Sequence, residues 1–110
     1  MNTIKHRKLA SGAWQKFSLV EQLGNIGSEI GRMRKWQFKD KKLYKNAFQR
    51  TLELFDLTIE DRRWQKRLKE ITRAREVFCD TVAGRKGYKT SLENLEHYFF
   101  QYALAARYHM

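Results

Sequence analysis

Apolar residues recur at helical spacing between Asp61 and Ala83, and this pattern restricts the fold more than any other feature of the sequence. Steps of four and three residues separate the members of one stripe, which are Trp64, Leu68, Ile71, Arg75, Phe78 and Val82. Such spacing places one side of an α-helix against a core. We therefore expect an amphipathic helix from Asp61 to Ala83, with Asp61 as its cap.

Two more helices are predicted before this one. Ser18 and Glu21 have the spacing of a capping box, and a four-three pattern of apolar residues continues from there to about Phe38. Asp40 is the expected cap of a second helix, Lys41–Glu60, which has apolar residues on two faces. This helix should therefore lie at the centre of the fold or bury one face against another subunit.

A last helix is predicted near the C-terminus. Gly84 and Gly87 should end the helix before it, because glycine accepts the left-handed conformation that closes many helices. Thr90 and Glu93 have capping-box spacing, and periodic apolar residues then continue towards Arg107. The sequence therefore contains four helical segments.

The connections between these segments are short, and no stretch shows the alternation of a β-strand. Short connections make neighbouring helices antiparallel. The expected fold class is all-α, an antiparallel up-down-up-down four-helix bundle over residues 18–110. Residues 1–17 precede it as a basic arm, in which Leu9, Trp14 and Phe17 either fold back on the core or dock on a neighbouring molecule.

Three glycines lie inside the first predicted helix, at Gly24, Gly27 and Gly31. Each costs about 1 kcal/mol relative to alanine in a helix interior, so something must approach this face closely. We expect the backbone of a neighbouring helix. The alternative is a ligand or an RNA backbone laid across the glycines.

The chain carries 23 basic and 12 acidic residues, a formal net charge of +11. This excess favours nucleic acid as a partner, although an acidic protein or a membrane surface has the same complementarity. Between Asp61 and Ala83 the bases come first and the acids come late, an order that opposes the helix dipole. We interpret these bases as a surface for a polyanion. A solvated charged face is the alternative.

The residues predicted to contact nucleic acid are bases of the third helix, supported by bases around the start of the second. They are Arg62, Arg63, Lys66, Arg67 and Arg73, together with Lys35, Lys41, Lys42 and Lys45. Contacts to phosphates recognise charge and shape rather than base sequence. A further basic run, Lys5–Lys8, either grips phosphates or forms a solubilising tail.

Catalytic, metal and cofactor chemistry is not expected from this sequence. His6, His97 and His109 lie on three different segments and have no ligand spacing with carboxylates or with Cys79. The single cysteine excludes an internal disulfide and fits a reducing compartment. No apolar run approaches 18 residues, and no hydrophobic segment of signal-peptide type follows the basic N-terminus. We therefore expect a cytoplasmic protein without a membrane segment.

Arg75 occupies a position of the apolar stripe, where a charge must find a partner or reach solvent. Glu29 on the first helix is the preferred partner, and Asp56 is the second choice. In the remaining alternative, Arg75 extends its stem over the core and leaves its guanidinium in water.

Four blocks of sequence prompt a family resemblance, and they are Ala47–Thr58, Arg63–Trp64, Leu68–Glu76 and Tyr98–Arg107. With these blocks, residues 18–107 resemble the small basic four-helix proteins. That family includes the accessory variability proteins of diversity-generating retroelements and the proteins encoded in 23S rRNA intervening sequences. The resemblance implies a non-catalytic homo-oligomer, typically a pentameric barrel. Its basic surface would bind RNA or DNA and, in the retroelement branch, a reverse transcriptase.

The predicted function is therefore that of a non-catalytic accessory protein that binds nucleic acid. A structural adaptor for an acidic protein is the alternative, and a small RNA-processing enzyme is the third. Self-association is expected because the last helix carries Tyr98, Phe100 and Tyr108 outside its own stripe.

Overall fold

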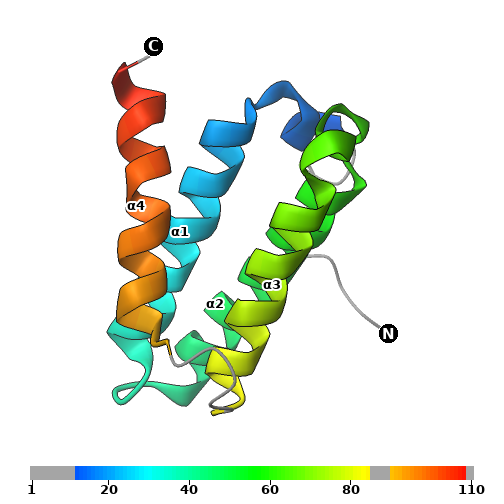
Figure 1. Cartoon of the computed structure of the whole chain (residues 1–110). Coiled ribbons are helices and arrows are strands. Elements are labelled where there is room, and N and C mark those ends of the chain that lie inside the picture. The colour runs from blue at the N-terminus through cyan, green and yellow to red at the C-terminus, as the bar shows by residue number, and fades with distance from the viewer. Residues whose placement is uncertain (1–11, 85–89, 109–110) are drawn as a thin grey trace.

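The computed structural model describes residues 12–84 and 90–108 of the chain, and all regular elements in this part are helical (Figure 1). The elements are η2 (Trp14–Lys16), α1 (Leu19–Trp36), α2 (Lys41–Glu60), η3 (Arg62–Arg67), α3 (Leu68–Val82) and α4 (Leu92–Tyr108), where η marks a 3-10 helix. The predicted all-α fold with four main helices is therefore confirmed for the described residues.

The first two helices begin where the sequence predicts. Oγ of Ser18 accepts a hydrogen bond from the backbone N–H of Glu21 at 3.1 Å, and the backbone N–H of Ser18 donates to the Glu21 carboxylate at 2.9 Å. These two bonds satisfy two otherwise unpaired donors and confirm the capping box. Oδ1 of Asp40 accepts from the backbone N–H of Leu43 at 3.0 Å, which confirms the cap of α2.

The ends of α3 and the start of α4 were predicted less accurately. Gly84 follows α3 with a φ of 76°, so a glycine does close this helix, while Gly87 lies outside the described residues. The capping side chain of α4 is Ser91, one residue after the predicted Thr90. Its Oγ accepts from the backbone N–H of Asn94 at 3.1 Å, because α4 begins at Leu92. The predicted Thr90–Glu93 capping box was therefore wrong by one residue.

The core lies where the four helices meet. Phe55 of α2 is fully buried, and its ring centre lies 5.7 Å from that of Phe78 of α3 and 5.9 Å from that of Phe99 of α4. α1 contributes a continuous apolar row, which consists of Leu19, Leu23, Ile26, Ile30 and Met33. In Figure 1, α1 lies beside α4, and α2 lies beside α3. Because α1 packs extensively on both α4 and α2 while α3 and α4 touch little, α1 takes the central position.

The glycine face of α1 packs against the backbone of α4, which confirms the first of the two predicted alternatives. A Cβ placed on Gly27 would lie 2.6 Å from Cβ of Phe99, and a Cβ on Gly24 would lie 3.1 Å from Cα of Ala103. Both neighbouring atoms belong to or adjoin the α4 backbone and cannot swing aside. The missing side chains therefore set the distance between α1 and α4.

A buried polar network ties η2 to α1, α2 and η3. Nε1 of Trp14 donates to Oγ1 of Thr58 at 3.1 Å. Nε2 of Gln22 donates to the backbone oxygen of Trp14 at 2.9 Å and to Oδ2 of Asp61 at 3.2 Å. Oε1 of Gln22 accepts from Nε1 of Trp64 at 2.9 Å. Since Gln22, Thr58 and Asp61 are all buried, these bonds offset the cost of removing their polar atoms from water.

Arg63 completes the polar network from its solvent side. Its Nη2 donates to Oδ2 of Asp61 at 2.7 Å and to the backbone oxygen of Phe17 at 2.7 Å, and its Nε donates to Oδ1 of Asp61 at 3.0 Å. The guanidinium also lies 4.4 Å from the centre of the Trp64 ring. Hydrogen bonds from Arg63 are the main reason that the pKa of Asp61 is lowered from its ordinary value.

The polar network explains why the predicted single helix from Asp61 to Ala83 was wrong. The segment divides into η3 and α3, with a non-helical Trp64 (φ −104°, ψ 21°) inside the first part. The backbone N–H of Arg63 donates a hydrogen bond to Oδ1 of Asp61 at 3.1 Å, and Nε1 of Trp64 donates to Oε1 of Gln22. These bonds favour a tight turn over a regular α-helix. The bases of η3 therefore precede α3 and do not form its first turns.

Two alternatives left open by the sequence are settled here. Nε of Arg75 donates to Oδ1 of Asp56 at 2.9 Å, so the second-choice partner is right and Glu29 is wrong. Glu29 instead pairs with Arg32, one turn along α1, at 2.7 Å. Its Oε2 is buried and has no hydrogen-bond partner among the described residues.

Trp14 folds back on the core, while the corresponding prediction for Leu9 lies outside the described residues.

Candidate nucleic-acid interface

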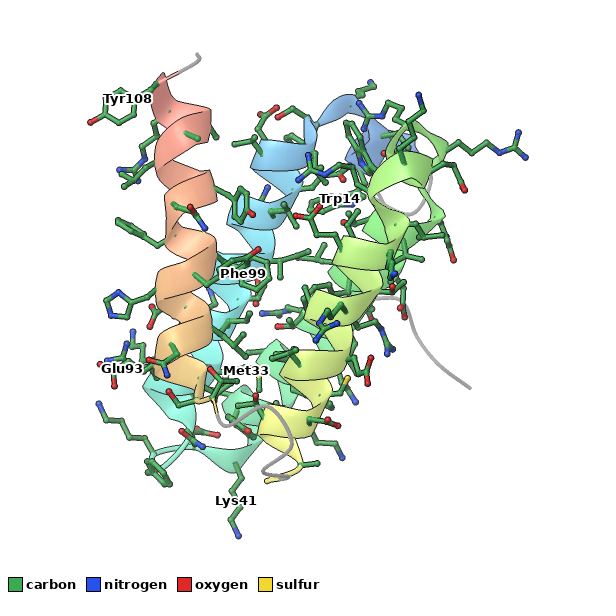
Figure 2. The ribbon with its side chains drawn as sticks, in the orientation of Figure 1. Trp14, Met33, Lys41, Glu93, Phe99 and Tyr108 are labelled. Carbon is green, nitrogen blue, oxygen red and sulfur yellow. The ribbon has the colours of Figure 1, made fainter. Side chains whose placement is uncertain are left out.

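The nine bases predicted to bind nucleic acid form two groups at opposite ends of α2. The η3 cluster consists of Arg62, Arg63, Lys66, Arg67 and Arg73, and it follows the C-terminal end of α2. The other four, Lys35, Lys41, Lys42 and Lys45, lie around the turn between α1 and α2. A helix of 20 residues is about 30 Å long. Figure 2 shows this separation, with Lys41 at one end of the molecule and Trp14 of the polar network towards the other.

Much of the η3 cluster already has partners within the chain. Arg63 belongs to the polar network, and Nε of Arg67 donates to the Glu70 carboxylate at 3.0 Å. Arg73 also has an interaction within the chain. Arg62 and Lys66 are exposed and have no ion pair among the described residues. The part of this cluster that is available for phosphates is therefore smaller than the sequence indicates.

The turn between α1 and α2 presents a denser group of available charges. We call it the turn surface, defined as Arg34, Lys35, Phe38, Lys39, Lys41, Lys42 and Lys45. Its four lysines from Lys39 to Lys45 are exposed and have no ion pair within residues 12–84 and 90–108. The one carboxylate in the turn, Asp40, is used to cap α2. These four lysines therefore carry positive charge without an acidic partner in the described part of the chain.

Phe38 lies in the middle of this turn with 91% of its surface exposed. Two open depressions adjoin it. One, of about 380 Å³, is lined by Gly31, Arg34, Lys35, Phe38, Lys39 and Glu96. The other, of about 520 Å³, is lined by Arg34, Gln37, Phe38, Thr81, Thr90, Ser91, Leu92 and Glu93. An exposed aromatic ring beside basic side chains combines the two groups that bind single-stranded nucleic acid, a π face and a positive charge.

Sequence reasoning missed Arg34, Phe38 and Lys39 as members of this surface. The signal was present in the run from Trp36 to Lys39, where aromatic residues alternate with polar and basic ones. We expected Phe38 to close the first helix, but α1 ends at Trp36 and the ring projects from the following turn. The pairing of Arg34 with Glu96 of α4 could not be read from local sequence.

The described residues offer little for other kinds of chemistry. No group of three or more histidine, cysteine, aspartate or glutamate side chains in this part is placed to hold a metal ion. His97 is exposed, whereas His6 and His109 lie outside the described residues. Burial raises the pKa of the Cys79 thiol, which disfavours the reactive thiolate. Within the same residues, each helix is too short or too polar to cross a lipid bilayer.

Comparison of the chain with models of known protein families, with characterised protein sequences and with solved structures finds no match. The resemblance to small basic four-helix proteins therefore stays a prediction.

Proposed function

We propose that the protein is a non-catalytic accessory protein that binds nucleic acid, with the turn surface as its main phosphate-binding site. The observation that carries this proposal is the set of exposed lysines from Lys39 to Lys45, which have no acidic partner in the described part of the chain. Lysines in this state bind phosphates without first breaking an ion pair. Binding also releases counterions condensed on the nucleic acid, which is the main source of affinity in such complexes.

In this proposal the turn surface contributes more to phosphate binding than the η3 cluster does. The sequence suggested the reverse order. Moving Arg63 towards a phosphate would leave the buried carboxylate of Asp61 without its main partner. Arg67 would likewise have to leave Glu70. Only Arg62 and Lys66 of the η3 residues 62–67 can turn to a phosphate without such a loss, so this cluster has a supporting role.

The net charge and the family resemblance support further proposals on topology, location, partners and oligomeric state. We propose an antiparallel up-down-up-down order for the four helices and a cytoplasmic location. The proposed partners are RNA or DNA and, following the resemblance, a retroelement reverse transcriptase. The proposed working form is a homo-oligomer, which would multiply weak phosphate contacts by bringing several turn surfaces onto one strand.

Self-association is expected to give a solution mass that is a multiple of 13.3 kDa, with five subunits favoured by the resemblance. The reason is the exposed aromatic side chains of α4, since Phe100 is 55% and Tyr98 is 45% exposed. Light scattering at micromolar concentration measures this mass, and Phe100→Ser should lower it. A mass of 13.3 kDa that persists as concentration rises would show a monomer and remove the homo-oligomer from the proposal.

Charge reversal at the turn surface tests the proposed binding site. The double variant Lys41→Glu with Lys42→Glu should lower affinity for a fluorescent oligonucleotide at least about ten-fold near 100 mM salt. It should also reduce the slope of log affinity against log salt by about two. Both residues are exposed and lie in the first turn of α2, where glutamate suits the helix dipole, so the fold should persist.

The matched control makes the same change of charge at the other end of α2. Arg62→Glu with Lys66→Glu should lower affinity less than about three-fold, because charges one helix length away are screened at this salt concentration. Equal losses in the two double variants would mean that net charge alone determines binding. If wild-type affinity does not fall steeply between about 50 and 200 mM salt, the proposed function is wrong. An acidic protein retained in a pull-down from nuclease-treated lysate would then support an adaptor.

A further inference from the structure

We propose that the turn surface binds single-stranded nucleic acid, with one unpaired base stacked on the ring of Phe38. This inference rests on the proposed function and adds the class of ligand that it takes. A phosphate-binding surface alone has no need of an aromatic ring, and an exposed phenylalanine gains nothing from contact with water. At 91% exposure, Phe38 contributes almost nothing to the core of the described chain.

The surroundings of Phe38 leave room for a base. The two depressions of about 380 and 520 Å³ have Phe38 and Arg34 in their linings, so the ring stands between two open spaces. Their volumes fall within the range of about 300–1,000 Å³ found for small-molecule sites. A planar base can therefore approach the ring without displacing the fold. Arg34 offers a second flat surface beside it, as a guanidinium that can stack as well as pair.

The charges around Phe38 indicate on which side of the ring the phosphate backbone of the strand lies. Glu93 and Glu96 of α4 contribute to the linings, and Glu96 is already paired with Arg34. Figure 2 places Glu93 at the start of α4, near the end of the molecule that carries Lys41. Phosphates are repelled by the α4 side and attracted by the lysines at the start of α2. The backbone of the strand should therefore follow α2, with its base turned towards Phe38.

A duplex cannot make this contact in the same way. Paired bases present only their edges in the grooves, because their π faces are covered by the neighbouring base pairs. A single strand exposes those faces, and stacking on an aromatic side chain is tolerant of sequence because every base has one. The turn surface should therefore discriminate between single and double strands more than between sequences.

The test compares a single strand with a duplex of the same number of phosphates on wild type and on Phe38→Leu. The probes are a fluorescein-labelled oligothymidylate of about 24 nucleotides and a blunt-ended duplex of about 12 base pairs, which has matched charge and no unpaired base, both measured by anisotropy. Phe38→Leu keeps an apolar side chain but removes the π face. It should lower affinity for the single strand about ten-fold, leave affinity for the blunt-ended duplex unchanged and leave the salt slope unchanged. Phe38→Trp should restore single-strand binding.

His97→Leu is the control, since it removes an exposed ring from α4 that belongs neither to the turn surface nor to the proposed self-association surface, and it should leave both affinities unchanged. If Phe38→Leu binds the single strand as well as wild type does, while the Lys41→Glu, Lys42→Glu variant still loses affinity, the stacking inference is overturned and the proposed function stands. Loss of affinity for both probes with a smaller particle mass would mean that Phe38 contacts another copy of the chain, which also overturns it. A wild type that shows no salt-dependent binding would overturn the proposed function itself.

Discussion

Gly27→Ala should lower the free energy of unfolding by about 2 kcal/mol, although alanine is the better helix former by about 1 kcal/mol. The added Cβ would meet Cβ of Phe99 at 2.6 Å, a distance that real carbon atoms do not adopt. Phe99 cannot rotate away from this contact, because its Cβ is fixed by the α4 backbone. α4 must therefore move away from α1 and loosen the packing of Phe99 in the core. Urea or thermal denaturation followed by circular dichroism measures the change.

Gly31→Ala on the same helix is the matched control. Its added Cβ would meet the side chain of Glu96, whose Oε2, the far end of a flexible side chain, would lie nearest at 2.7 Å. Glu96 can give way, so the gain in helix propensity should leave this variant as stable as wild type or up to about 1 kcal/mol more stable. If both substitutions changed stability by the same amount and in the same direction, close packing of α1 on α4 would not explain the glycines.

Asp61→Ala should lower the free energy of unfolding by about 3 kcal/mol. The substitution removes the cap of η3 and the acceptor for Arg63, and it removes one of the two acceptors of the Gln22 amide. Because 42% of the Arg63 side chain is exposed, water partly replaces its lost partner, and the cost stays below that of a fully buried ion pair. Denaturant unfolding gives the value.

Asp56→Ala provides the comparison, since Asp56 also pairs with one arginine. Asp56 is 52% exposed and Arg75 is 35% exposed, so breaking this pair should cost less than about 1 kcal/mol. A similar cost for both aspartates would contradict the importance assigned to the polar network.

The pH dependence of unfolding gives Asp61 a second signature. The pKa of Asp61 is lowered in the folded chain, chiefly by hydrogen bonds from Arg63, so protonation is harder in the folded than in the unfolded state. Its stabilising contribution is therefore complete above the ordinary pKa of 3.8 and is lost as pH falls through the lower pKa of the folded state. In the Asp61→Asn variant, the free energy of unfolding should therefore fall less steeply as pH decreases through this acid range.

The parts of the fold that depend on local sequence could be predicted. The caps at Ser18 and Asp40 use partners three residues away, and the apolar stripes state directly which face of a helix is buried. The break of the predicted helix at Trp64 could not be found in this way, because Gln22, which holds the indole, is 42 residues away in the chain. The partner of Arg75 was ambiguous for a similar reason. Glu29 lies beside the apolar stripe of α1, and its ion pair with Arg32 is seen only in the structure.

The candidate site was predicted in part, since charge is visible in a sequence and exposure is not. Lys41 and Lys42 were among the predicted residues, but they were ranked below Arg63, whose guanidinium has a structural role at Asp61. Phe38 was taken as the approximate end of the first helix, because the four-three pattern continues as far as Gln37 and does not show where the helix stops. Its projection from the turn depends on how the chain leaves α1 for α2.

The packing of α1 against α4 also has a consequence for how the chain is made. Gly27 lies in α1 and Phe99 in α4, so this contact joins the first of the four described α-helices to the last. During synthesis α1 leaves the ribosome early, and its glycine face has no cover until the segment Leu92–Tyr108 follows. The nascent chain therefore passes through a stage in which α2 can already pack on α1 and α3 on α2, while the contact of α1 with α4 waits until α4 has been synthesised.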